Sequence, residues 1–125
     1  MSDVKFEKTV PVLAVRNVVA AIAFYTHKLG FTCSYTDSPQ TPGYAVVGRD
    51  EVVIHLQSHA PEEFGHGEGP ELRFRVVNVD GLFEEYRTQD VFHSRTTLQD
   101  TPWGTREFAF FDPDGNGLFF YSIRQ

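Results

Sequence analysis

The sequence predicts an α+β fold made of two βαβββ modules, and two observations carry that prediction. The motif V-x-N-V-x6-Y occurs at 15–25 and again at 76–86, displaced by 61 positions. Each copy also follows an apolar run typical of a strand and precedes three further runs of this kind. Self-similarity in both motif and element order indicates a tandem repeat of one structural unit.

Each copy of the motif marks the start of a predicted helix, at 18–29 and at 79–88. Asn17 and Asn78 stand where a side chain can accept hydrogen bonds from the free N–H groups of the first turn. Gly30 follows the first helix, where a left-handed residue commonly ends one. The apolar residues that share one helix face are Val18, Ile22, Tyr25 and Leu29 in the first helix and Val79, Leu82, Phe83 and Tyr86 in the second.

Strands are predicted before and after both helices. The expected strands are 10–15, 31–35, 44–47 and 52–56 in the first module, and 72–77, 92–98, 105–111 and 118–123 in the second. Hairpin turns are expected at 48–50 and at 112–116. In the second turn, Pro113 fixes φ and Gly115 accepts a positive φ. We therefore expect one domain, 1–125, with module one at about 8–57, a polar Gly- and Pro-rich linker at 58–70, and module two at about 71–124.

Composition excludes several classes of partner. The net charge is −6 and the pI is near 5.2, which argues against nucleic acid, because phosphate neutralisation needs clustered Lys and Arg. There is neither a basic amphipathic segment nor an apolar run of the roughly 20 residues that would span a membrane. Residues 1–9 lack a signal core and Cys33 is the single cysteine, so we expect a cytoplasmic protein without an intrachain disulfide.

The 12 Phe, 5 Tyr and one Trp can fill a core or line a ligand cleft, and an acidic chain favours a cationic ligand over an anionic one. No nucleophile elbow, phosphate loop or dinucleotide motif is present. Cys33 is expected to be a buried or half-buried thiol. The linker cluster of His59, Glu62, Glu63 and His66 is interpreted as solvated side chains, and His27 and His93 receive no role.

Three stretches resemble a known family: 10–13, 24–31, and 103–108 leading into the turn 112–116. They are similar to the vicinal oxygen chelate superfamily, which contains glyoxalases and extradiol dioxygenases, and specifically to its bleomycin resistance protein branch. The resemblance implies that each sheet curves into half of a cleft. It also implies a homodimer, often with the first strand exchanged, in which both clefts are built across the interface.

The resemblance places the metal-ligand positions of catalytic relatives on Val10, His55, Glu71 and Phe119. Only His55 and Glu71 carry donor atoms, whereas zinc sites and the iron facial triad need at least three protein ligands. The expectation is therefore no cofactor and no metal, and a cleft that binds without catalysing a reaction.

In the resistance proteins a flat bithiazole stacks between aromatic rings and acidic residues attract the cationic tail of the drug. By resemblance, the aromatic wall falls on Tyr35, Tyr44 and Trp103. Alternatively, the tyrosines are ordinary strand residues and Trp103 is a core anchor. Acidic candidates for the cationic tail are Asp37, Glu71 and Asp100.

The chain departs from the branch at Arg73, which replaces a second stacking tryptophan. Arginine can stack on a flat ring, but it adds positive charge where a cationic drug would sit. The binding site predicted as a whole comprises Tyr35, Tyr44, His55, Arg73, Trp103, Asp37, Glu71 and Phe119.

Three functions compete at this point. The first is an antibiotic-binding resistance protein that captures bleomycin-type glycopeptides, or a similar flat aromatic cationic compound, in a dimer cleft. The second is a metal-dependent enzyme of the same superfamily, acting on a small oxygenated substrate through His55 and Glu71. The third is a structural or regulatory dimer whose cleft is filled by its own side chains.

Overall fold

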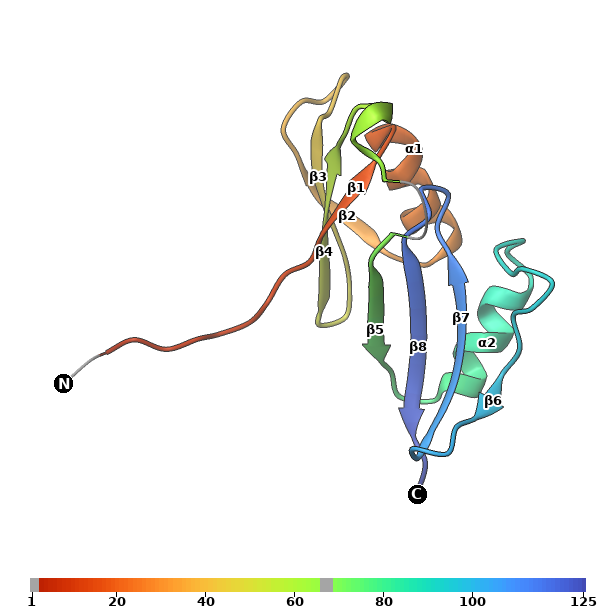
Figure 1. Cartoon of the computed structure of the whole chain (residues 1–125). Helices are drawn as coiled ribbons and strands as arrows, with labels where there is room; N and C mark the ends of the chain where they lie inside the picture. The colour runs from red at the N-terminus through yellow and green to blue at the C-terminus, as the bar shows by residue number, and fades with distance from the viewer. Residues whose placement is uncertain (1–2, 66–68) are drawn as a thin grey trace.

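The computed structural model describes residues 3–65 and 69–125, which form two sheets of four strands, each covered on one face by a helix (Figure 1). The first module contains β1 (Val12–Val15), α1 (Val18–Ala23), η1 (Phe24–Lys28), β2 (Thr32–Thr36), β3 (Tyr44–Arg49) and β4 (Val52–Ser58). The second contains β5 (Glu71–Arg75), α2 (Val79–Arg87), β6 (Gln99–Asp100), β7 (Thr105–Phe111) and β8 (Gly117–Ile123). A short 3-10 turn, η2 (Pro61–Glu63), lies between them.

The two sheets have the same topology. The strand orders are β1-β4-β3-β2 and β5-β8-β7-β6, with the first strand of each module parallel to the last and the other pairs antiparallel. The first strand of each module pairs with the last because the helix carries the chain across the sheet. The α+β class and the two βαβββ modules are thus confirmed. Among the described residues, no helix is long and apolar enough to cross a membrane.

Both helices begin at the predicted asparagines. Asn17 accepts a hydrogen bond from the N–H of Ala20 at 2.9 Å, and Asn78, itself left-handed with φ 65°, accepts one from Gly81 at 3.1 Å. The first helix departs from the expected regular helix: after Ala23 it continues as the π-helical turn η1. Such a turn places one more residue in the hydrogen-bonded ring than an α-helix does.

The strand predicted at 92–98 is wrong. Only Gln99–Asp100 pairs with β7, and the preceding residues form a loop closed by its own side chains. The hydroxyl of Thr96 accepts from the N–H of His93 at 3.0 Å and donates to the carbonyl of Ala109 at 2.9 Å. Threonine side chains compete with a strand ladder in this way. The first hairpin turn is also shifted, because Gly48 and Arg49 belong to β3 and Asp50 takes the positive φ of 52°.

Most of the phenylalanines fill the core. Phe120 on β8 lies at the centre of an aromatic cluster, with ring centroids 5.0 Å from Phe74, 5.3 Å from Phe108 and 5.5 Å from both Phe110 and Tyr86. All five of these rings are at most 8% exposed. Offset and edge-on contacts between buried rings add stabilisation beyond the burial of their area. The high aromatic content therefore serves mainly the packing of the second sheet against α2.

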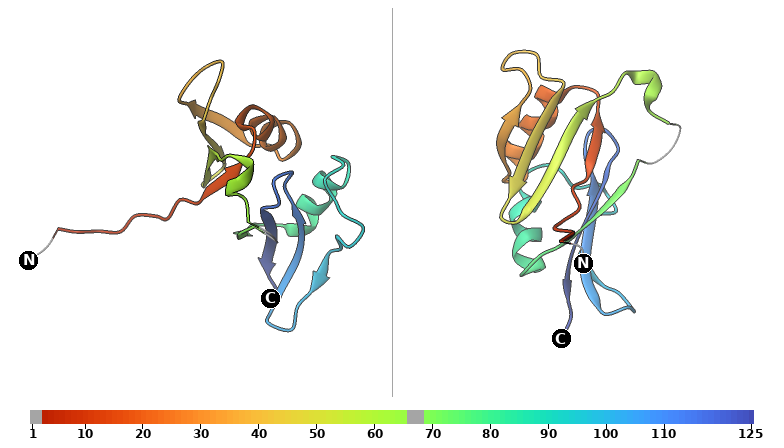
Figure 2. Two further views of the ribbon diagram at one scale, coloured as in Figure 1. Left: turned by 45° about the horizontal axis from the view of Figure 1, so that its top comes forward. Right: turned by 90° about the vertical axis from the view of Figure 1, so that its left-hand side faces the viewer.

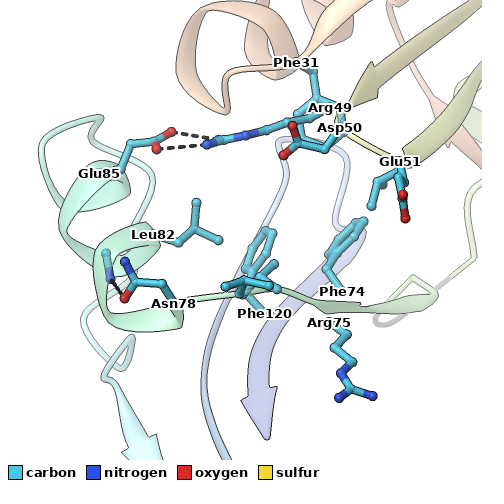
Figure 3. A pocket seen from close by; sticks show the side chains of 14 residues that line it. Phe31, Arg49, Asp50, Glu51, Phe74, Arg75, Asn78, Leu82, Glu85 and Phe120 are labelled. Atoms are coloured by element: carbon cyan, nitrogen blue, oxygen red, sulfur yellow. Dashed lines mark hydrogen bonds and ion pairs between the residues drawn. The ribbon is translucent and has the colours of Figure 1, made fainter.

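Polar side chains join the two modules. The Tyr25 hydroxyl donates to Asp112 at 2.8 Å, and the Tyr86 hydroxyl donates to the carbonyl of Leu29 at 2.8 Å. Arg49 donates to the same carbonyl and makes a two-pronged ion pair with Glu85 (Figure 3). This pair borders a cleft of about 710 Å³ between the modules, which contains none of the predicted binding residues.

Gly30 is the residue at which a side chain would be least tolerated in this junction. Its φ is +79°, and a Cβ there would lie 2.9 Å from Arg49 Nη1. Gly30→Ala is expected to lower the free energy of unfolding by about 1–2 kcal/mol, measured by urea denaturation, because L-residues are strained at this φ. Gly65→Ala is the matched control, since its Cβ would meet nothing within 4 Å. Equal losses for the two variants would contradict the prediction.

Candidate functional site

Most of the predicted site residues lie on the sheet faces that the helices leave open. In the first sheet, alternation buries Leu13, Val47, Ile54 and Leu56 against α1 and turns their neighbours outward. Register then aligns Val12, His55, Val46 and Tyr35 in one row across four strands. An irregularity in β2 between Cys33 and Tyr35 brings Tyr35 opposite Val46, and its side chain is left 54% exposed.

Tyr44 and His55 are brought together on this face. The Tyr44 hydroxyl lies 2.7 Å from His55 Nδ1, and the rings meet edge to face with centroids 5.4 Å apart. Both residues are half-buried, so the pair forms a fixed polar and aromatic surface. Cys33, on the neighbouring strand, is the half-buried thiol that the sequence predicted.

Asp37 has a structural role that the sequence analysis did not foresee. Its Oδ1 accepts hydrogen bonds from the N–H groups of Gly43 at 2.9 Å and Tyr44 at 3.2 Å, which closes the loop between β2 and β3. Both bonds use the same carboxylate oxygen.

On the open face of the second sheet, Arg73 and Phe119 are neighbours across β5 and β8. The Arg73 guanidinium carbon lies 5.9 Å from the centre of the Phe119 ring and 4.7 Å from that of Tyr121. Glu71 begins β5 opposite Gly117 and is exposed. A pocket of about 390 Å³ opens on this face, lined by Glu107, Ala109, Phe111, Gly117 and Phe119 and by the loop 93–97.

Arg73 is paired with Glu107, a residue to which the sequence assigned no role. The guanidinium makes two hydrogen bonds to the carboxylate, at 2.9 and 3.3 Å, across the intervening strand β8. Glu107 also accepts a bond from the hydroxyl of Thr105 at 2.6 Å and is only 7% exposed. The hydrogen bonds from Arg73, ahead of those from Thr105 and Trp103, hold the pKa of Glu107 below its usual value.

This lowered pKa predicts a pH dependence of stability. A carboxylate whose pKa is depressed on folding contributes stability that is present above its ordinary pKa, near 4.5, and is lost as the pH falls through the folded-state pKa. The difference in unfolding free energy between wild type and Glu107→Gln is therefore expected to be larger at pH 7 than below pH 4.5. Urea titrations across this range measure it, and a difference that grows on acidification would contradict the assignment.

Trp103 lies in the turn before β7 and is 67% exposed, so the alternative that it anchors the core is wrong. Asp100, a second acidic candidate, is engaged by Arg106 at 3.0 Å and by Arg124 at 3.6 Å. His93, to which no role was assigned, accepts a hydrogen bond from the N–H of Phe111 at 2.9 Å and so holds the pocket loop against β7.

The metal site of catalytic relatives does not fit these residues. Of the four positions, Val10 and Phe119 offer no donor atom, and His55 already contacts Tyr44. Within residues 3–65 and 69–125, no three His, Cys, Asp or Glu side chains lie close enough together to hold an ion. In the linker, His59 lies 3.6 Å from Glu63, whereas His66 falls outside the described residues.

The predicted site residues of one chain are divided between its two sheets. Figures 1 and 2 show α1 and α2 each covering one face of its own sheet, which leaves the opposite face of each sheet without a helix. In the described part of the chain, no hydrogen bond or ion pair joins Tyr35, Tyr44 or His55 to the predicted site residues of the second module.

The fold, and the open sheet faces with their aromatic side chains, define a class of protein with paired βαβββ modules. The model of the Glyoxalase/Bleomycin resistance protein/Dioxygenase superfamily matches residues 8–120, and the chain belongs to this superfamily. Proteins named bleomycin resistance protein from Geobacillus stearothermophilus and Staphylococcus aureus are each 30% identical to it, over an alignment that covers 91% of this chain and 95% of theirs.

Solved structures agree with this assignment. A bleomycin-binding protein from bleomycin-producing Streptomyces verticillus, complexed with copper(II)-bleomycin, superposes with a TM-score of 0.79 at 27% identity, covering 98% of this chain and 99% of that one. TioX from Micromonospora sp. ML1 gives a TM-score of 0.78 over 94% of this chain and 99% of its own, and at 20% identity it supports the fold alone.

Proposed function

We propose that the protein is an antibiotic-binding resistance protein, which sequesters bleomycin-type glycopeptides or a similar flat aromatic cationic compound without catalysis. The observation that carries the proposal is the exposure of two large aromatic side chains beside the open sheet faces, Trp103 at 67% and Tyr35 at 54%. A planar ligand would bury both, and each stacked ring is worth about 0.5–1.5 kcal/mol beyond the burial of its area. The 30% identity to bleomycin resistance proteins supports the same ligand class.

In this proposal the predicted residues divide by chemistry. Tyr35, Tyr44 and Trp103 form the aromatic wall, and His55, Arg73 and Phe119 form the floor of the two open faces. Asp37 and Glu71 attract the cationic tail of the ligand. The net charge of −6 favours the approach of such a cation at low ionic strength.

A homodimer is part of the proposal, because the two open faces that carry the predicted residues belong to separate sheets. A second copy would set the first-module face of one chain against the second-module face of the other. The N-terminal segment before β1 extends away from both modules (Figure 1), and Phe6 within it is 96% exposed. An apolar side chain on an extended arm is suited to packing against a partner. We also propose that residues 1–125 act as one domain in each copy.

The absence of catalysis is proposed from the side chains at the four metal positions. The competing enzyme would need at least three donors, and Val10 and Phe119 supply none. Elemental analysis of the purified protein tests this point. One equivalent of a divalent metal per chain, lost together with ligand binding in His55→Ala, would support the enzyme instead.

The binding test uses the single tryptophan as its reporter. Metal-free bleomycin A2 is titrated into the protein while Trp103 fluorescence and heat are followed in parallel. We expect saturation at micromolar concentration or below, with one drug molecule per chain and the drug recovered unchanged. Spermidine is the control, since it carries the positive charge without the flat rings and is expected to leave the fluorescence unaltered. No heat and no fluorescence change with bleomycin A2 would overturn the proposed function.

A further inference from the structure

Arg73 adds a positive charge to a cleft whose proposed ligand is itself a cation, so its contacts there need an explanation. Its guanidinium covers the Tyr121 ring at 4.7 Å, and its edge is bound by both oxygens of Glu107. The side chain keeps 43% of its surface exposed, so it is accessible to a ligand. A guanidinium stacks through its face while it forms ion pairs through its edge.

The carboxylate that binds it belongs to a buried and fully bonded network. Thr101 and Thr105 share a hydrogen bond between hydroxyls at 2.8 Å, and Thr105 donates onward to Glu107 at 2.6 Å. All three residues are at most 7% exposed. Because every bond is made within the second module, Glu107 is held in place before any ligand arrives.

We propose that Glu107 determines the charge preference of the ligand cleft: it balances the charge of Arg73 and holds the guanidinium in place, so that the ion pair is neutral as a whole and Arg73 offers its planar group as a stacking surface. The inference rests on the proposed function and adds a specificity-determining pair to it. Arg73 stacks on the ligand ring, and Glu107 is a positioning residue that acts through Arg73. The ligand class that this pair selects is a planar heteroaromatic ring carrying a cationic tail.

The contribution of Glu107 is separable from a general structural role by comparing ligands of opposite charge. Bleomycin A2 carries a cationic tail, whereas bleomycinic acid has the same bithiazole with a carboxylate in its place. Glu107→Gln keeps the shape of the side chain but leaves one uncompensated positive charge. We expect its preference to shift about tenfold towards bleomycinic acid, an effect that weakens as salt is raised, because one unit charge within about 10 Å is being changed.

Two further variants complete the test. Arg73→Gln/Glu107→Gln removes both charges and is expected to restore the wild-type preference, which loss of structure would not do. Glu85→Gln breaks the comparable ion pair with Arg49 on the other cleft, and its ratio of affinities is expected to stay unchanged. An unaltered ratio in Glu107→Gln would overturn the inference.

A second pair of probes distinguishes failure of this inference from failure of the proposed function. Thioflavin T is a flat cationic benzothiazole, and 8-anilinonaphthalene-1-sulfonate is a flat anion. If wild type binds neither bleomycin compound but Glu107→Gln inverts the preference between these dyes, the proposed function fails and the role of Glu107 stands. If wild type binds bleomycin A2 but Glu107→Gln changes neither the ratio of affinities for the bleomycin compounds nor that for the dyes, the function stands and the inference fails.

Discussion

Replacing Asp112 with alanine is expected to lower the free energy of unfolding by about 3–5 kcal/mol, because it would leave several buried donors without a partner. Asp112 is 4% exposed and accepts from the Tyr25 hydroxyl at 2.8 Å and from the Asn116 amide at 2.9 Å. It also accepts from the backbone N–H groups of Asp114 and Asn116, both at 2.9 Å. Urea denaturation followed by circular dichroism measures the loss.

The size of this effect follows from where Asp112 lies. It begins the turn between β7 and β8, yet its partner Tyr25 belongs to the first module, and Asn116 of the same turn donates to the carbonyl of Ala14. One carboxylate therefore fixes a turn and joins two modules. Loss of such a group costs more than one bond, because the remaining polar atoms cannot all reach water.

Two matched variants identify the source of the effect. Tyr25→Phe removes one of the four bonds and is expected to cost about 1–2 kcal/mol. Asp114→Ala alters an aspartate of the same turn that accepts from the backbone N–H of Arg16 at 2.9 Å and pairs with the half-exposed Arg16 guanidinium at 3.2 Å, and the expected cost is about 1–2 kcal/mol. A loss in Asp112→Ala no greater than that in Asp114→Ala would contradict the prediction, because the four bonds of Asp112 would then contribute no more than the contact of Asp114 with Arg16.

The repeat in the sequence was sufficient to predict the order of the elements. The strand β7 begins and ends where the alternation of 105–111 placed it, and Asn17, Asn78 and Gly30 have the roles predicted for them. Local signals suffice in these cases because caps and turns depend on residues close in sequence. At 92–98 the prediction failed, because a threonine side chain replaced the strand ladder with bonds that alternation does not reveal.

The site was less predictable than the fold. The contact of Tyr44 with His55 depends on strand register, which the sequence left open, as it left open whether Trp103 is exposed or buried. Glu107 lies within the stretch 103–108 that resembles the family, but its pairing with Arg73 joins residues 34 positions apart across a third strand. The sequence signal for this pair is an arginine and a glutamate that both point outward from predicted strands of one sheet. Whether the two side chains meet depends on the order of those strands.

The largest functional effect is expected from mixing two defective variants. Tyr35 lies on the first sheet and Trp103 in the turn that precedes β7 of the second sheet, and both are exposed. Tyr35→Ala and Trp103→Ala are each expected to weaken bleomycin A2 binding about tenfold or more, since each loses a stacked ring together with its buried area. If each cleft takes one residue from each chain, a mixed dimer contains one cleft with both aromatics intact and one with neither.

Co-refolding equal amounts of the two variants is therefore expected to restore wild-type affinity in about a quarter of the clefts, because random pairing makes half of the dimers mixed and each of these has one intact cleft of two. Calorimetry resolves this population from the weak sites. The reverse mixture is the control: wild type refolded with Tyr35→Ala/Trp103→Ala is expected to fall from half to about a quarter of intact clefts, since its mixed dimers have none. If both aromatics instead serve a cleft within one chain, the first mixture restores nothing and the second stays at half. That outcome would exclude a cleft shared between two copies, but it would not contradict the proposed identity of the ligand.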